Sequence, residues 1–545
     1  MIWWIWKGGG GGLSNSHFGG RCCATLRAGH RIQFLILSLL LVALASSEPP
    51  VPDDCQSRTY EDGLSLDCSL SAINSDAEKT NFSVLPSEHT KSLTVKCRDP
   101  ILSQLEADGL RSLRHLKSLT LDGCHLRSIP SRAFRGLTNL VSLTVVTRNA
   151  GVLVIEADAF AGLPNLETLD LSGNYIRHVS PGALCALTKL SSLNLSKNEL
   201  SSMSDLGIET CAAGDMAMVK ILDMSSNALN SLTGDGLSKW PQLQELKLSN
   251  NYLRGLDKTT FSLGASSKNL RLIDLSNNQL NGLHRSLFKG LANLRHLDTL
   301  ILANNTFTQL PDTLFDEVTA LKELDLSGNF LTSITSRLLN RLHDIQHLDL
   351  SQNEIENIHA QAFSGLKRLK YLRLDSNRLS KIPKGLLRSC GEAIQTLVLS
   401  DNAITRLSSQ LFANLAILSH LGLDKNLLED LPTSLFANTS NLKVLDLSHN
   451  RFTMIPEAVN VSALQSLQSL SLSGNLVSSL GNLQMPSLWR LEVSDNRLTN
   501  VTSANLGGLP GLQVLDLSNN QITSIEKAAF GLNRPLKALR LDSNR

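Results

Sequence analysis

The sequence predicts a repetitive α/β solenoid in which each repeat adds one short strand to a continuous parallel sheet. The stretch LDLSNNQI at 515–522 recurs in near copies, such as LDLSGNYI at 169–176 and LDLSQNEI at 348–355. Most copies lie 24 or 25 residues apart, and their leucines alternate with other residues as they do in a half-buried strand. With 42% hydrophobic residues in 545, the chain has enough apolar material for a core that runs through every repeat.

The aligned copies share the frame L-x-x-L-x-L-x-x-N-x-L, which is the leucine-rich repeat pattern. In the L-x-L part the leucines are expected to face the core and the x residue to face out. The asparagine follows the strand, where its buried amide can bond backbone groups of its own and neighbouring turns. This position holds Asn174, Asn198, Asn227, Asn251, Asn278, Asn305, Asn329, Asn353, Asn377, Asn402, Asn426, Asn450, Asn475, Asn496, Asn520 and Asn544. Two earlier units fit the frame with another residue there, which makes about 18 units.

The second half of each repeat carries an outer apolar pattern, as in EIENIHAQAFSGLKR at 354–368. We expect this half to form the convex return as short helices or 3-10 turns. Because strands pack closer together than the segments opposite them, the repeats should curve into a horseshoe. The spacing is irregular at Asn198–Asn227, with 29 residues, and at Asn475–Asn496, with 21. We interpret both as variation in loop length.

The first 45 residues are predicted to be a leader and a secretory signal peptide. Basic residues lead into an apolar run from Ile32 to Leu44, and small residues then provide a cleavage site at Ala43 and Ala45. The run is too short to span a bilayer, and no later stretch is long enough either. The predicted organisation is a leader over 1–45, a cysteine-containing N-terminal cap over 46–115, and repeats over 116–545 that end without a C-terminal cap.

Four of the nine cysteines cluster at the front of the mature chain. In a secreted protein they predict a disulfide-stapled cap over the exposed end of the core. The favoured pairs are Cys55–Cys68 and Cys97–Cys124, although four cysteines allow three connectivities.

Three further cysteines follow within the repeats. Cys185 and Cys211 lie in adjacent repeats, and we expect them to pair and to anchor the long insertion between Asn198 and Asn227. Cys390 is left over. We interpret it as a buried free thiol, with an intermolecular bridge as the alternative.

Six N-x-S/T sequences predict a glycosylated, exposed surface. They start at Asn81, Asn194, Asn304, Asn438, Asn460 and Asn500. Asn194 falls in the outward position of a predicted strand, so a glycan there would shield that part of the concave sheet from a partner.

The outward position of the strand is acidic in eight of the repeats. Its acidic members are Asp170, Asp223, Asp274, Asp325, Asp349, Asp446, Glu492 and Asp516. We interpret them as a consensus choice for a solvated sheet face, on which Asp516 and Ser518 face out. The alternative is a concave binding face for a basic partner.

Nothing in the sequence indicates an enzyme or a cofactor. His343 and His347 have the spacing of a zinc pair, but no glutamate accompanies the first, and the frame runs from turn to strand between them. Nucleotide-binding loops and nucleophile elbows are missing from suitable contexts. The 51 basic and 49 acidic residues nearly balance, which argues against a nucleic-acid partner.

The front of the chain carries a more specific resemblance. LSAINSDAEKTNFSVLPSEHTKSLTVKC at 70–97 resembles the N-terminal segment of insect Toll receptors of the 18-wheeler and Tollo type, and GALCALTKLSSLNLSKNELSSMSDLGI at 182–208 continues the likeness. The resemblance implies the ectodomain of a single-pass receptor that acts in innate immunity or in developmental cell recognition. It further implies a protein ligand, either a cystine-knot cytokine of the Spätzle type or a cell-surface protein, and dimerisation of the receptor.

Toll receptors also have further repeats, cysteine-rich caps, a membrane span and an intracellular TIR domain, whereas this sequence stops at LRLDSNR, inside a repeat. We therefore expect a C-terminally truncated gene product. It would be extracellular by itself, and would lie on the outer face of the plasma membrane if the full-length protein has the missing C-terminal span. The alternative is a secreted or tethered leucine-rich-repeat adhesion protein.

Overall fold

The fold is described from a computed structural model of the chain. The described residues are 51–545 except 62, 76–78, 148–150, 213, 233–236, 238, 257–259, 262–268, 286, 288–295 and 461. The predicted leader and signal peptide lie outside them. Apart from Val51, the described residues belong to one unit, Pro52–Arg545, and this unit is described by itself.

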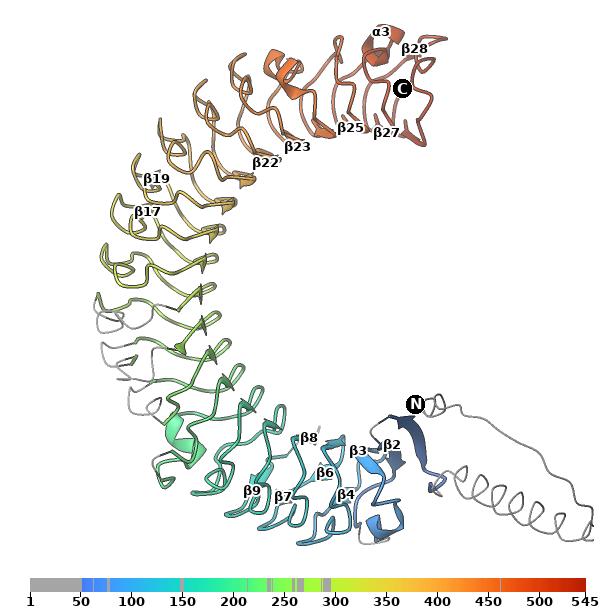
Figure 1. The fold of residues 1–545 in the computed structure, drawn as a ribbon. Coiled ribbons are helices and arrows are strands. Elements are labelled where there is room, and N and C mark those ends of the chain that lie inside the picture. Colours follow the sequence, from blue (N-terminus) through green and yellow to red (C-terminus); the bar gives the residue numbers. More distant parts are fainter. Residues whose placement is uncertain are drawn as a thin grey trace, which may run out of the picture. The chain divides into compact units, whose positions relative to one another are not determined.

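Successive repeats each contribute one strand to a single sheet on the inner side of this unit (Figure 1). The strands are β1 (Cys55–Tyr60), β2 (Gly63–Leu70), β3 (Thr90–Cys97), β5 (Ser118–Asp122), β8 (Ser142–Val146), β10 (Thr168–Asp170), β11 (Ser192–Asn194), β12 (Ile221–Asp223), β13 (Glu245–Lys247), β14 (Leu272–Asp274), β15 (Thr299–Ile301), β16 (Glu323–Asp325), β18 (His347–Asp349), β20 (Tyr371–Arg373), β21 (Thr396–Val398), β22 (His420–Gly422), β23 (Val444–Asp446), β24 (Ser469–Ser471), β25 (Arg490–Glu492), β27 (Val514–Asp516) and β29 (Ala538–Arg540). The middle leucines pair in register from strand to strand, as Leu169, Leu193 and Leu222 do. The predicted parallel solenoid is confirmed.

The convex return segments consist mainly of turns, with a few short helices, in line with the expected short helices or 3-10 turns. The return strands are β4 (Leu102–Ser103), β6 (His125–Leu126), β7 (Ser128–Ile129), β9 (Val154–Ile155), β17 (Ser333–Ile334), β19 (Asn357–Ile358), β26 (Asn500–Val501) and β28 (Ser524–Ile525). The described helices are η1 (Phe82–Val84), η2 (Met203–Leu206), η4 (Glu457–Val459), η5 (Ser462–Leu464) and α3 (Ser503–Leu506). Elsewhere single i→i+3 bonds such as Ala362 N–H to His359 O bend the chain. Such short segments cannot offset the cost of nucleating a helix.

The core consists of the strand leucines and a column of phenylalanines under the convex turns. The fully buried phenylalanines of this column are Phe134, Phe160, Phe261, Phe315, Phe363, Phe412 and Phe436. Phe307 and Phe452 are also fully buried, but they hold the leucine position of the frame, two residues after its asparagine. Phe412 and Phe436 come from neighbouring repeats, and their ring centroids lie 6.0 Å apart in a stacked arrangement. Each repeat therefore completes its core with rings from the next, and a single repeat could not bury this surface alone.

The asparagine of the frame joins each repeat to the one before it. The Nδ2 group of Asn353 donates to the carbonyl oxygens of Leu326, Leu350 and Ser351, at 2.9, 3.2 and 3.0 Å. Its Oδ1 accepts the N–H of Leu331 at 3.0 Å. The residue is only 7% exposed. One side chain thus satisfies four backbone groups that leave the strand inside the core, as the frame predicts.

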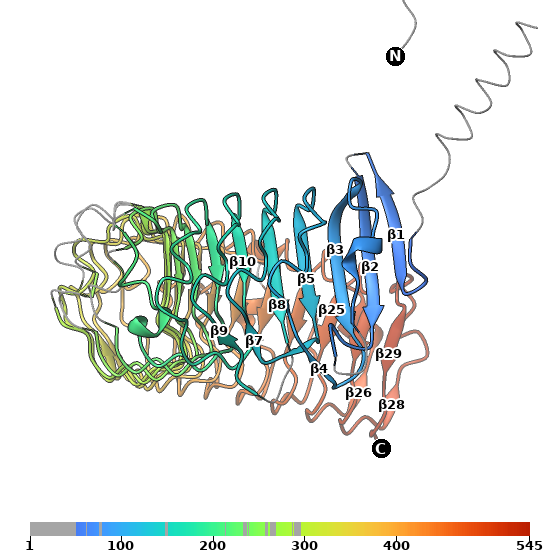
Figure 2. The same cartoon turned by 90° about the horizontal axis from the view of Figure 1, so that it is seen from below.

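Disulfides hold the N-terminal end of the solenoid. Cys55 and Cys68 join the antiparallel hairpin β1–β2, and Cys97 is bonded to Cys124. These are the two pairs that the spacing favours. Figure 2 shows the hairpin at the end of the sheet, next to β3 and β5. The hairpin and its disulfide therefore cover leucines that would otherwise end the core in water.

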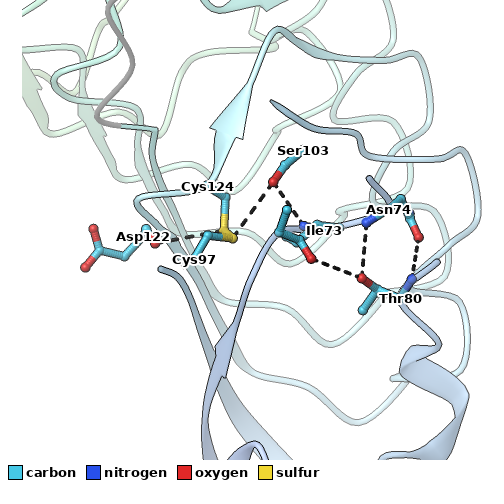
Figure 3. Close-up of a disulfide and its surroundings, with 8 residues drawn as sticks. Ile73, Asn74, Thr80, Cys97, Ser103, Asp122 and Cys124 are labelled. Carbon is cyan, nitrogen blue, oxygen red and sulfur yellow. Dashed lines mark hydrogen bonds between the residues drawn. A yellow bond between two sulfur atoms is a disulfide. The ribbon is translucent and has the colours of Figure 1, made fainter. Parts of the chain in front are cut away.

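Backbone and side-chain hydrogen bonds connect Ile73, Asn74 and Thr80 beside the Cys97–Cys124 disulfide (Figure 3). The N–H of Ile73 donates to the hydroxyl of Ser103 at 3.0 Å. Asn74 and Thr80 exchange two hydrogen bonds, because each backbone N–H donates to the other's side chain, at 3.1 and 2.9 Å. This segment belongs to the stretch that resembles Toll receptors.

The long repeat between Asn198 and Asn227 contains η2 and Cys211, which is bonded to Cys185 of the preceding repeat. Burial opposes ionisation of Asp205, but hydrogen bonds from Ser201 and Ser202 outweigh it and lower the pKa of this carboxyl. The helix ends at Gly207, whose φ is 60° and where a Cβ atom would lie 2.6 Å from the carbonyl oxygen of Val179. The insertion is therefore a compact, stapled turn against its neighbour.

Cys390 is a buried free thiol, as interpreted from the sequence. Its sulfur donates to the carbonyl oxygen of Leu387 at 3.5 Å, and burial raises the pKa of the thiol to about 12. The thiolate that forms disulfides is strongly disfavoured there, so the alternative of an intermolecular bridge lacks support.

Candidate concave binding face

The concave sheet presents two outward residues per strand, one on each side of the buried middle leucine. In β18 these are His347 and Asp349, with Leu348 buried between them. We call the first of these positions the first slot and the second the last slot. The predicted acidic residues all occupy the last slot.

Most of the last-slot carboxylates accept a backbone hydrogen bond that forms the turn at the end of their own strand. The Oδ1 atom accepts the backbone N–H two residues further on, at 2.9–3.0 Å, in Asp170, Asp223, Asp274, Asp325, Asp349, Asp446 and Asp516. Asn194 does the same with Ser196. Glu492, whose chain is longer, contacts the guanidinium of Arg490 instead. A short side chain with an acceptor oxygen stabilises this turn, which explains the recurrence of aspartate without any partner.

The expectation that Asp516 and Ser518 face solvent is wrong. They are 9% and 7% exposed, because the Ser518 hydroxyl donates to Asp516 at 2.6 Å and the guanidinium of Arg540 lies 3.4 Å from the same carboxylate. The exposed residue of this motif is Asn519, which adopts the left-handed conformation with φ 50°. Asp516 is therefore not available to a partner as the sequence suggested.

The acidic row is interrupted for three consecutive strands, by Arg373 in β20, Val398 in β21 and Gly422 in β22. Beside this interruption the rings of His347 and Tyr371 stack in the first slot, with centroids 4.4 Å apart. Tyr371 is 39% exposed, so much of its ring is open to solvent. We call His347, Tyr371, Arg373, Val398 and Gly422 the β18–β22 platform.

Two carboxylates hold the guanidinium of Arg373 in place. Its Nε and Nη2 atoms donate to the two oxygens of Asp375 at 3.1 and 2.9 Å, and Nη1 lies 3.3 Å from Asp349. The hydrogen bond to Asp375 outweighs the effect of burial and, with the nearby acids, raises the pKa of Arg373. The arginine is therefore charged and fixed, and not a mobile surface side chain.

Burial is the main influence on the two central acids. It raises the pKa of Asp349, and the neighbouring charge of Asp325 adds to this, although Ser351 and Arg373 act in the opposite direction. Burial likewise raises the pKa of Asp446, with further contributions from Asp424 and Glu492. The sheet face thus carries more negative charge than it can fully stabilise.

We expect Asp349→Asn to be at least as stable as the wild type at pH 7. The raised pKa means that the folded chain binds this proton more tightly than the unfolded chain, so stability falls as the pH rises through the folded pKa. Asparagine keeps the acceptor for Ser351 and removes the poorly solvated charge. Thermal unfolding at pH 7 should show a gain below about 1 kcal/mol, which disappears near pH 3.

Asp223→Asn is the matched control, because it preserves the equivalent bond to Ser225 in another strand. A loss of stability at pH 7 in Asp349→Asn alone would contradict the expectation. It would show that the ion pair with Arg373 outweighs the cost of burial.

Basic residues gather where the strands begin, and the sequence interpretation overlooked them. They stand immediately before the first slot, at Lys117, Lys220, Arg271, Lys322, Lys370, Lys443 and Lys537. In the sequence these basic residues hold the second position of the L-x-x-L part of the frame, and this recurrence could have revealed them. This basic rim is three residues from the acidic last slot, about 10 Å along an extended chain. Basic residues therefore predominate at this edge of the sheet and acidic residues at the other. Glu167 and Asp298 hold the rim position of their own strands, and Asp298 lies 3.7 Å from Lys322.

The predicted glycosylation sites lie mostly away from the concave slots. Asn81 caps η1, Asn304 occupies an exposed turn after β15, and Asn500 starts β26. The Nδ2 groups of Asn438 and Asn460 donate to backbone oxygens of neighbouring return segments, at 2.8 and 3.0 Å. Asn194 is in the last slot of β11. Glycosylation remains a prediction for all six.

Among the described residues we find no arrangement suited to catalysis or metal binding. Cys185 and Cys211 lie near Asp215, but their disulfide removes the thiolates that a metal would need. His343 bonds the carbonyl oxygen of Gly365 while His347 stacks on Tyr371, so the two histidines do not converge. An open cavity of about 610 Å³ around Met454 and Leu480 contains a single carboxylate, Glu457.

The fold and the cap define a solenoid built of leucine-rich repeats. The leucine-rich repeat family matches residues 145–200, 241–298, 295–355, 320–379, 367–428, 418–477 and 486–545, which is more than half of the chain. The protein therefore belongs to the leucine-rich repeat family. Among the described residues, none of the helices has the length and apolar character needed to cross a membrane.

Several solved structures share this fold. The Toll–Spatzle complex of Drosophila is similar over 90% of this chain and 70% of that chain, with 21% identity and a TM-score of 0.71. The plant peptide hormone receptor RGFR1, in complex with RGF2, is similar over 84% and 81%, with 21% identity and a TM-score of 0.53. The mouse RP105/MD-1 complex follows over 90% and 84%, with 21% identity and a TM-score of 0.51. At these identities the similarity establishes the fold.

Proposed function

We propose that this chain is the extracellular ligand-binding region of a Toll-like transmembrane signalling receptor, acting in innate immunity or developmental cell recognition. Its ligand is a protein, of the cystine-knot cytokine class. The observation that carries the proposal is the concave sheet itself, where Arg373 replaces the aspartate of the last slot and the exposed ring of Tyr371 lies in the first slot of the same strand. Tyrosine and arginine are the residues that most often dominate protein–protein binding energy.

Two further observations support the proposal. The solved structures with this fold include receptors bound to a protein ligand, as in the Toll–Spatzle complex. The three disulfides suit the oxidising environment outside the cell, which fits a location on the outer face of the plasma membrane. We include dimerisation of the receptor in the proposal, because the structures with this fold include receptors in complexes with other proteins.

A binding experiment with a soluble cystine-knot cytokine dimer of the Spätzle type tests this function. The secreted chain, immobilised through its C-terminus, should bind the dimer saturably by surface plasmon resonance. Beads coated with the same chain should remain dispersed when no ligand is added. Clustering of these beads without ligand, together with no binding of the dimer, would overturn the proposal in favour of homotypic adhesion.

A further inference from the structure

The β18–β22 platform has the physical properties of a contact site and not only of a sheet surface. The stack of His347 on Tyr371 restrains both rings while leaving the tyrosine 39% exposed. A restrained aromatic side chain loses little conformational entropy when a partner covers it. The same ring still offers a large apolar area and a hydroxyl for bonding.

Arg373 adds a flat surface next to these rings. Three of its five N–H donors face carboxylates, because Nε and Nη2 donate to Asp375 and Nη1 lies 3.3 Å from Asp349. The guanidinium can therefore offer a partner its two remaining N–H groups and its planar face, on which an aromatic side chain can stack. Val398 lies opposite Arg373 in the register, and Gly422 opposite Val398. The three adjacent last slots have no carboxylate of their own, and the nearest carboxylates on these strands, Asp375 and Asp424, lie two residues further along.

Negative charge flanks the platform on both sides along the last-slot row. Asp325 and Asp349 precede it, and Asp446 and Glu492 follow it. The basic rim, with Lys322, Lys370 and Lys443, lies at the opposite ends of the same strands. A partner that places its cations over the last-slot carboxylates is attracted to them. A partner bound the other way round would bring its cations against the lysines of the basic rim.

From these observations we propose that the β18–β22 platform binds a basic protein segment that carries an aromatic anchor. The anchor covers Tyr371 and the face of Arg373, and the flanking lysines or arginines of the partner face Asp325, Asp349 and Asp446. The inference rests on the proposed function, since it assigns a contact surface and a partner chemistry to that receptor. None of the predicted glycosylation sites occupies a slot between β16 and β29. The predicted site that does occupy a slot, Asn194, is in β11.

Fluorescence anisotropy with labelled peptides tests the inference on the secreted full chain. The probe is a five-residue peptide with tryptophan between two pairs of lysines. The comparison peptides replace the lysines by glutamates or the tryptophan by glycine. We expect the lysine–tryptophan peptide to bind at least about tenfold more tightly than either comparison peptide. Equal binding of the three peptides, or none by the lysine–tryptophan peptide, overturns the inference.

Variants of the sheet locate the contact. Tyr371→Ala should weaken peptide binding about tenfold, while Tyr371→Phe, which preserves the stack, should stay within about twofold. The double variant Asp325→Asn/Asp349→Asn should weaken it about fivefold. The matched double variant Asp170→Asn/Asp223→Asn keeps the same strand-end bonds elsewhere and should have no effect. If the matched variant weakens binding equally, the attraction is diffuse and the assigned contact site is wrong.

The cytokine assay separates this inference from the proposed function. If Tyr371→Ala and Asp325→Asn/Asp349→Asn bind the cytokine dimer as tightly as the wild type, the platform is not the contact site. The proposed receptor function would still stand. Peptide binding that depends on Tyr371, with no binding of the dimer, overturns the cytokine class and retains the platform.

Discussion

Replacing Asn353 by alanine is expected to lower the free energy of unfolding by about 3 kcal/mol. The substitution removes three hydrogen bonds donated by Nδ2 and the one accepted by Oδ1. The backbone N–H of Leu331 would then be left without a partner inside the junction between two repeats, where water cannot replace the amide. The carbonyl oxygen of Leu326 would keep only the hydrogen bond from Asn329. The change in midpoint of urea unfolding, followed by circular dichroism, measures the effect.

Asn441→Ala provides the control for this substitution. Its Nδ2 also bonds a backbone oxygen of the preceding repeat, that of Ala416 at 2.8 Å, but the side chain is exposed. Water can replace this bond, so the loss should stay below about 1 kcal/mol. Similar losses for the two variants would show that burial of the frame asparagine is not what makes it important.

Replacing Phe412 by alanine should cost about 3–5 kcal/mol. The ring is fully buried and stacks on Phe436 of the next repeat, so alanine leaves a cavity that lies across two repeats. A cavity at this junction weakens the nearest-neighbour contact on which a solenoid depends. We expect a lower midpoint in urea and a broader transition, because the repeats on either side are less strongly coupled.

Phe330→Ala is the matched control, because this phenylalanine is 47% exposed on the surface. Its loss should change stability by no more than about 0.5 kcal/mol. A cost below about 1 kcal/mol for Phe412→Ala would contradict the view that the phenylalanine column joins the repeats.

The repeat frame made most of the fold predictable. A leucine at every second strand position and an asparagine after each strand specify one local structure, and repetition at 24 or 25 residues requires stacking. The three cysteine pairs could likewise be inferred, because each pair lies in the same or an adjacent structural unit. The short return segments were expected as helices or 3-10 turns, but which of them form a helix could not be read from the apolar pattern, because segments of this length are close to the limit for nucleating one.

The candidate site was much less predictable. The acidic residues of the last slot were recognised from the sequence. Their role in the turn was not, because it depends on the direction of the backbone N–H two residues later, which is set only when the strand end is folded. The frame places Arg373 in the outward position of its strand. It does not reveal that Asp349 and Asp375 hold the guanidinium or that Tyr371 stacks on His347. Asp349 and His347 lie a whole repeat before Arg373 and Tyr371 in sequence and meet them only across paired strands.

The sequence by itself determined the architecture of this protein, because each repeat contains all the information needed for its own strand, turn and contact with a neighbour. The tertiary structure alone decided which outward residues can meet a partner. Asp516 and Asp349 occupy equivalent positions, yet Arg540 covers the first, while the second helps to hold an exposed platform. An arginine on the adjacent strand faces each aspartate, but Arg373 is also bound by Asp375. Such contacts join residues that lie about a whole repeat apart in sequence and side by side in the sheet, so they exist only in the folded chain.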